Sequence, residues 1–141
     1  MQIGVESSRA VENKRVFVVD SDEITRAVLQ FMLHDENETH EIASVAAAYQ
    51  KAADWTPDVI LLGMPIVRAR GIGVVSEIRE RLPGVKIAIV ADSSADAAAQ
   101  DCLKQGAHSL LTKPLTIETV RRRVDVLLGR RTALSIPVSP V

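Results

Sequence analysis

The chain has 141 residues, of which 47% are hydrophobic, 25% charged and 3% aromatic, and its formal net charge is −1. This composition is typical of one globular domain, and the balanced charge and scarce aromatic side chains argue against nucleic acid or an anionic membrane as a partner. A single cysteine, Cys102, excludes an internal disulfide, and no long apolar run or secretory leader is recognisable, so we expect a cytoplasmic protein.

Strand and helix patterns alternate five times along the chain. Short apolar runs predict strands at residues 16–19, 41–45, 58–62, 85–90 and 109–112. Apolar repeats at helical spacing, with capping residues at their starts, predict helices at residues 23–34, 46–53, 74–82, 94–105 and 116–128. The first helix is predicted from the repeat of Ile24, Ala27, Val28, Phe31 and Met32.

The remaining segments carry no such pattern. Residues 63–73, which contain Pro65, are expected to form a loop after the third strand. We expect flexible segments at residues 1–14 and 130–141, on either side of one domain at residues 15–129.

Five short βα units predict a three-layer, doubly wound α/β sandwich around a five-stranded parallel sheet. The third strand is apolar throughout, which is typical of a strand buried on both faces. In such a sheet the carboxyl ends of strands 1, 3, 4 and 5 meet at one edge, where ligands and chemistry gather. The residues expected at that edge are Asp20, Ser21, Gly63, Ala91 and Lys113.

Three stretches, VFVVDSDEITR, PDVILLGMP followed by GIG, and LLTKPLT, occur here in the order and at the intervals of a known family. On these stretches the chain resembles the CheY-like receiver domain of bacterial response regulators, over roughly residues 14–129. The resemblance implies a flavodoxin-like fold with strand order 2-1-3-4-5. It also implies a role in two-component, phosphorelay signal transduction.

The same resemblance implies a pocket that has lost its chemistry. A working receiver holds Mg²⁺ with two adjacent acids after strand 1, phosphorylates an aspartate at the end of strand 3, and uses a Ser/Thr after strand 4 and a lysine after strand 5. Here Asp20 and Lys113 are retained, whereas Ser21, Gly63 and Ala91 stand at the other three positions. Glycine offers no nucleophile, and one carboxylate with a hydroxyl is a poor Mg²⁺ site. We therefore expect a degenerate phosphorylation pocket without metal, cofactor or catalytic residue, in a pseudo-receiver that is not an enzyme.

The retained lysine needs a new partner, because a buried ammonium is costly unless it is paired. We predict a structural Asp20–Lys113 ion pair. Arg70, in the loop after strand 3, could also reach the pocket, although solvation is the simpler expectation.

The expected output is protein–protein contact, as a constitutive or ligand-tuned adaptor. Partners would be a histidine kinase, an output protein or a second copy of the chain, and neither nucleic acid nor membrane. The resemblance places the contact face on the fourth helix, fifth strand and fifth helix, with Ala95, Ala98, Ala99, Leu110, Arg121 and Arg122 as its candidate residues. Helix propensity explains the alanines equally well.

Two alternatives use the same edge of the sheet. The emptied pocket could hold a small molecule. Asp20 and Asp22 also have the spacing of a haloacid-dehalogenase-like phosphatase, with Asp20 as nucleophile and Asp22 as general acid/base. Against this, Asp22 suits a helix N-cap and the chain has no room for a cap domain.

Overall fold

The computed structural model describes residues 14–130, so the expectations for residues 1–13 and 131–141 lie outside it. It contains five strands in this range: β1 (Arg15–Val19), β2 (Glu38–Ile42), β3 (Val59–Gly63), β4 (Lys86–Ala91) and β5 (Ser109–Thr112). All pairings are parallel and the strand order is β2-β1-β3-β4-β5. The predicted doubly wound sheet is therefore confirmed.

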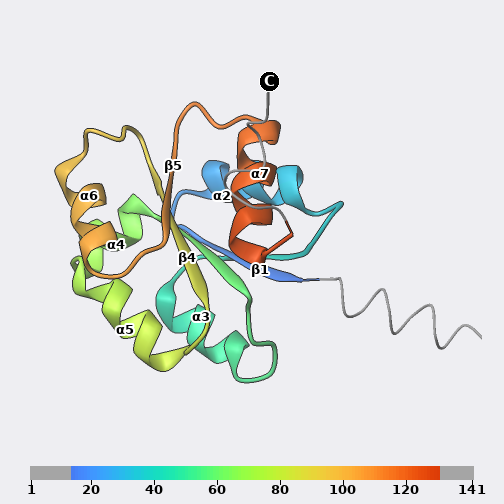
Figure 1. Ribbon diagram of the computed structural model, residues 1–141. Helices are drawn as coiled ribbons and strands as arrows, with labels where there is room; N and C mark the ends of the chain where they lie inside the picture. The colour runs from blue at the N-terminus through green and yellow to red at the C-terminus, as the bar shows by residue number, and fades with distance from the viewer. Residues whose placement is uncertain (1–13, 131–141) are drawn as a thin grey trace, which may run out of the picture.

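Helices cover both faces of the sheet (Figure 1). The described residues form α2 (Glu23–Leu33), α3 (Val45–Ala52), α4 (Met64–Arg70), α5 (Gly73–Arg81), α6 (Ala97–Lys104) and α7 (Ile117–Leu128). Buried side chains of α2 and α7 pack on one face of the sheet, and those of α3, α4, α5 and α6 pack on the other. This arrangement is the three-layer sandwich expected from the sequence.

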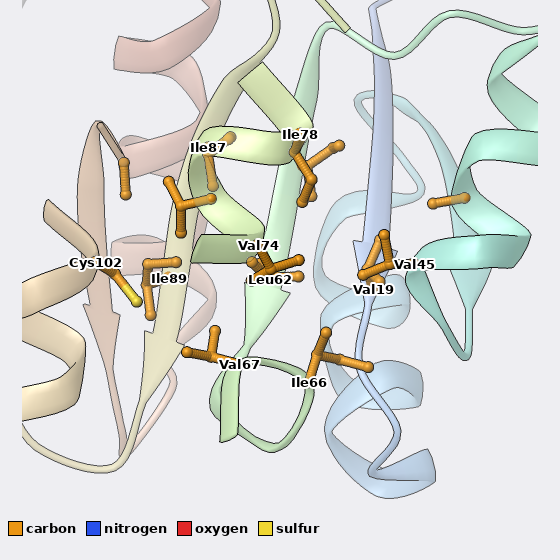
Figure 2. Packing of buried hydrophobic residues seen from close by; sticks show 14 of the residues in the cluster. Val19, Val45, Leu62, Ile66, Val67, Val74, Ile78, Ile87, Ile89 and Cys102 are labelled. Atoms are coloured by element: carbon orange, nitrogen blue, oxygen red, sulfur yellow. The ribbon is translucent and has the colours of Figure 1, made fainter. Parts of the chain in front are cut away.

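The central strand β3 divides its side chains between the two layers. Ile60 and Leu62 join the cluster under α3 to α6, shown in Figure 2, whereas Val59 and Leu61 join the cluster under α2 and α7. This period of two follows from the alternation of side chains along a strand. Because helices cover both faces of the sheet at β3, this strand needs no polar residue, which explains its fully apolar sequence.

Cys102 lies in the first of these clusters and is fully buried. Burial raises the pKa of its thiol, and the carboxylates of Asp101 and Asp96 raise it further. A thiol that resists ionisation is a poor nucleophile, so Cys102 acts as a small apolar core residue.

Three elements differ from the sequence predictions. The second strand is Glu38–Ile42 and not residues 41–45, because this edge strand is mostly polar and is held by backbone pairing with β1 and by an Arg15 Nε–Glu38 Oε2 contact of 2.6 Å. The expected loop after β3 contains the helix α4, whose Met64, Ile66 and Val67 are buried. The predicted helix at residues 94–105 is shorter, since its N-cap is Asp96 and α6 begins at Ala97. Within the described part of the chain, no helix has the length and apolar character needed to cross a bilayer.

Candidate functional site

Four strand ends meet at one edge of the sheet, as expected. Asp20 follows β1, Gly63 ends β3, Ala91 ends β4 and Lys113 follows β5. The backbone N–H of Lys113 donates to the carbonyl of Ala91 at 3.0 Å, and the N–H of Asp20 donates to Ile42 at 3.1 Å. The predicted pocket residues are therefore neighbours, and their side chains decide what the edge can do.

The side chain of Asp20 lies over Gly63. Its Oδ1 accepts the backbone N–H of Asp22 at 2.8 Å, and only 2% of the residue is exposed. A Cβ at position 63 would overlap Asp20 Oδ2. The backbone of Gly63 is ordinary extended chain, with φ of −77° and ψ of 147°. The position of the Asp20 carboxylate, and not the backbone conformation, is what requires a residue without a side chain at position 63.

Burial raises the pKa of the Asp20 carboxyl above its ordinary value of 3.8. The hydrogen bond from the Asp22 N–H lowers it, the negative charge of Asp22 raises it, and the positive charges of Lys113 and Arg26 lower it by smaller amounts. Desolvation is the largest of these effects because the carboxylate has almost no contact with water.

This raised pKa predicts a pH-dependent difference between the wild-type protein and Asp20→Asn. An acid whose pKa is higher in the folded state stabilises the fold most below its unfolded pKa, and that contribution is lost as pH rises through the folded pKa. Urea unfolding of both proteins should be measured from below the unfolded pKa of Asp20, near 3.8, to above its higher folded pKa. As pH rises through this interval, the free energy of unfolding of Asp20→Asn should increase relative to that of the wild type, and above it the difference should stay constant. A difference that does not change with pH would contradict the assignment.

Neither Ser21 nor the side chain of Asp22 forms a hydrogen bond with the Asp20 carboxylate. Ser21 is exposed. Asp22 caps α2, accepting the N–H of Ile24 at 3.2 Å and the hydroxyl of Thr25 at 2.7 Å. The Thr25 hydrogen bond is the main cause that lowers the pKa of Asp22. The capping role predicted for Asp22 is confirmed.

These donors do not fit the Mg²⁺ that the receiver resemblance implies. Mg²⁺ requires several oxygen ligands in near-octahedral geometry. One Asp20 oxygen is held by the Asp22 N–H and the other faces Gly63, while both oxygens of Asp22 are used as helix caps. Among residues 14–130 no group of three or more His, Cys, Asp or Glu side chains is placed to hold a metal ion.

The predicted Asp20–Lys113 ion pair is wrong. Lys113 Nζ instead lies 3.4 Å from Asp92 Oδ1, and both side chains are substantially exposed. An ammonium that reaches water avoids the desolvation that pairing with the buried Asp20 would demand. Arg70 also lies away from the pocket, because its guanidinium donates to Glu77 at 2.8 Å.

The predicted partner face is only partly available at the surface. Ala99 is fully buried in the core, so its assignment to this face is wrong; a helix buries one face, and Ala99 lies on it. Ala98 and Leu110 are half-buried against the same core. Arg121 donates to the carbonyl of Met32 at 2.9 Å and so ties α7 to α2. Exposed side chains remain at Ala95 and Arg122.

A second surface was missed by the sequence analysis. Ile24, Val28 and Phe31 point outward from α2 and are 75%, 37% and 70% exposed. The buried face of α2 is formed by Thr25, Leu29 and Leu33. The apolar repeat that predicts this helix therefore belongs mainly to its outer face, which we call the α2 outer surface (Ile24, Val28 and Phe31). The available signal was the presence of apolar residues on both faces of one helix.

The α2 outer surface adjoins an apolar hollow. This hollow has a volume of about 350 Å³, and its walls include Ile24, Val28, Pro114 and Leu115. Lys113 also lines it. Contiguous exposed apolar side chains beside a hollow are typical of a protein interaction site.

Comparisons with known proteins agree with this fold. The family model "Response regulator receiver domain" matches residues 16–125. The DNA-binding transcriptional activator DevR/DosR of Mycobacterium tuberculosis is 29% identical over 120 residues, covering 82% of this chain and 55% of that protein. The chemotaxis protein CheY of Halobacterium salinarum is 26% identical over 116 residues, covering 82% of this chain and 97% of that protein.

A solved response regulator from Thermotoga maritima has the same fold, with a TM-score of 0.75 at 19% identity, covering 83% of this chain and 98% of that one. The chain spans about half the length of the transcriptional regulators that it matches. The remaining part of those relatives lies outside the match. The similarity therefore concerns the sheet and the helices that cover it.

Proposed function

Because the chain belongs to the response regulator receiver domain family, whose members are signalling domains that contact kinases and output domains, we propose that it signals through protein contact without phosphorylation at position 63. The observation that carries this proposal is the Asp20 carboxylate lying where a side chain of residue 63 would begin.

The chemistry of the strand ends supports the proposal. Formation of an acyl phosphate requires a carboxylate that a phosphoryl donor in solution can reach. Gly63 has none, and Asp20 is 2% exposed with one oxygen already hydrogen-bonded. Ala91 has no hydroxyl with which to bind a phosphate, and Lys113 is paired with Asp92. Each part of a phosphorylation pocket is thus missing, inaccessible or otherwise engaged.

The α2 outer surface supports the second half of the proposal. Exposing Ile24 and Phe31 contributes nothing to the stability of this fold, whereas a partner helix could bury both. We propose this surface as the principal contact with a protein partner, with an apolar side chain of that partner entering the hollow beside Pro114 and Leu115. Ala95 and Arg122, the exposed residues of the partner face predicted from the sequence, would form a separate contact.

The two alternatives receive less support from the geometry. A small molecule at the emptied pocket would have to displace the Asp20 carboxylate from Gly63. A phosphatase would need an accessible Asp20 and a free Asp22, which is instead a helix cap. The expectation that nucleic acid is not a partner stays a prediction, since one relative is a DNA-binding activator.

Incubation with acetyl phosphate and Mg²⁺ tests the proposal directly. We expect the intact mass to stay that of the unmodified chain, and beryllofluoride with Mg²⁺ to leave the backbone amide resonances of Gly63, Ala91 and Lys113 unshifted. Asp20→Asn is the control. A mass gain of one phosphoryl group that disappears in Asp20→Asn would show that Asp20 is an acceptor and would overturn the proposal.

A further inference from the structure

A second hollow lies at the amino ends of the strands, opposite the edge that carries Asp20 and Gly63, where β4 begins. It has a volume of about 480 Å³, which is within the range of small-molecule sites, and lies between α5, the start of β4 and the turn after α6. We propose that this hollow binds a small phosphate monoester, whose phosphate is held by Arg79, Lys86 and His108. This site is independent of the proposed function, which concerns the other edge.

Among the residues that the structure describes, the two cations of the hollow have no acidic partner. Arg79 and Lys86 both line it, and within residues 14–130 neither makes an ion pair. Glu80 is the one acid among the lining residues, and it pairs with neither cation. By contrast Arg70, at the end of the preceding helix α4, is paired with Glu77 at 2.8 Å. Two unpaired cations in one hollow leave the positive charge available to a ligand.

Arg79 is held in position by a glycine. Its side chain lies against Gly106, where a Cβ would come within 2.5 Å of Nη1 and 2.8 Å of Cδ. Gly106 has a φ of +115°, which side chains other than glycine's rarely adopt. The guanidinium therefore rests on backbone, and a side chain that is already positioned loses less conformational entropy when a ligand binds.

His108 supplies a third donor. Its Nδ1 accepts the backbone N–H of Ile87 at 3.0 Å, so Nδ1 carries no proton and the hydrogen of the neutral ring is on Nε2. Burial lowers the pKa of His108, and the charges of Lys86 and Arg79 lower it further. The histidine is therefore a neutral N–H donor that shares the electrostatic field of both cations.

The donors define the class of ligand. A guanidinium, an ammonium and an imidazole N–H all donate, which suits the oxygens of a phosphate. The helices α5 and α6 end near this edge, and their carbonyl ends disfavour an anion. The basic residues of their last turns, Arg79 and Arg81 in α5 and Lys104 in α6, offset that effect, and Lys86 adds a further positive charge at the start of β4. Pro83 and Val85 provide an apolar wall for the organic part of an ester.

Titration of the ¹⁵N-labelled chain tests the site, with inorganic phosphate and adenosine monophosphate as probes and potassium chloride at matched ionic strength as the blank. We expect saturable shifts of the Ile87 amide and the His108 ring resonances with both probes, and none with chloride. Binding of phosphate also favours the protonated ring, so the pKa of His108 should rise.

Charge-neutral variants separate a site from a general charge effect. Arg79→Gln and Lys86→Gln should each weaken binding about tenfold, which is the loss of one charge-assisted hydrogen bond. Arg122→Gln removes one charge from an exposed position on α7 and should bind as wild type does. Shifts that do not saturate, that chloride reproduces, or that survive in both hollow variants would overturn the site. Binding of phosphate but not of the nucleotide would overturn its assignment to an ester.

Discussion

Replacing Gly63 with alanine is expected to lower the free energy of unfolding by about 1–3 kcal/mol, the usual cost of overpacking a buried position. The added methyl group would meet the Asp20 carboxylate at a distance that no real contact shows, although the backbone of Gly63 suits any residue. Urea unfolding measures the loss. Gly73→Ala is the matched control, since a Cβ there meets nothing within 4 Å, and its stability should be unchanged or slightly higher.

Substitutions at Asp20 identify the cause. Asp20→Ala removes the carboxylate, so Gly63→Ala in that background should cost little, and the two changes should be non-additive by about 1 kcal/mol or more. Asp20→Asn keeps the size of the side chain and should not relieve the clash. If the effects of Gly63→Ala and Asp20→Ala simply add, the carboxylate does not occupy the space beside residue 63.

Polar substitution on the α2 outer surface is expected to abolish most partner binding while leaving the fold intact. Phe31→Ser and Ile24→Ser each remove a large apolar side chain that is mostly exposed, so the stability of the free chain should change by only about 0.5 kcal/mol. Central apolar anchors of an interface are worth roughly 2 kcal/mol or more on truncation, which is a loss of about thirtyfold in affinity.

The measurement is retention of partner proteins from the native cell extract on the immobilised chain, followed by affinity determination with the purified partner. Trp55→Ser is the matched control, because Trp55 is also a large side chain, 48% exposed, and lies outside the α2 outer surface. Equal retention by the Phe31, Ile24 and Trp55 variants would place the contact elsewhere, with the exposed residues of α6 and α7 as the next surface to test.

The architecture could be predicted from local patterns because each signal is carried by neighbouring residues. The run Val59 to Leu62 is apolar throughout, which identifies a strand covered on both faces before any contact is known. Capping residues such as Asp22 and Thr116 mark helix starts for the same local reason. The polar edge strand β2 was misplaced because backbone pairing with β1, and not its own pattern, makes it a strand.

The candidate site was predictable as a set of positions but not as a geometry. Strand ends bring Asp20, Gly63, Ala91 and Lys113 to one edge in any sheet of this order. Which of them touch depends on side-chain torsions, on burial and on competing partners. The exposed Asp92 attracts Lys113 away from the buried Asp20, and no spacing in the sequence indicates this.

The amino-acid sequence by itself determined the alternation of five strands with five of the helices, α4 excepted, and the absence of a carboxylate at position 63, because both depend on local residue types. Only the tertiary structure decided that Asp20 fills the space beside Gly63 and that α2 presents Ile24 and Phe31 to solvent. The physical reason is that a side chain's direction and burial are set by residues distant along the chain, which are adjacent only after the sheet has formed.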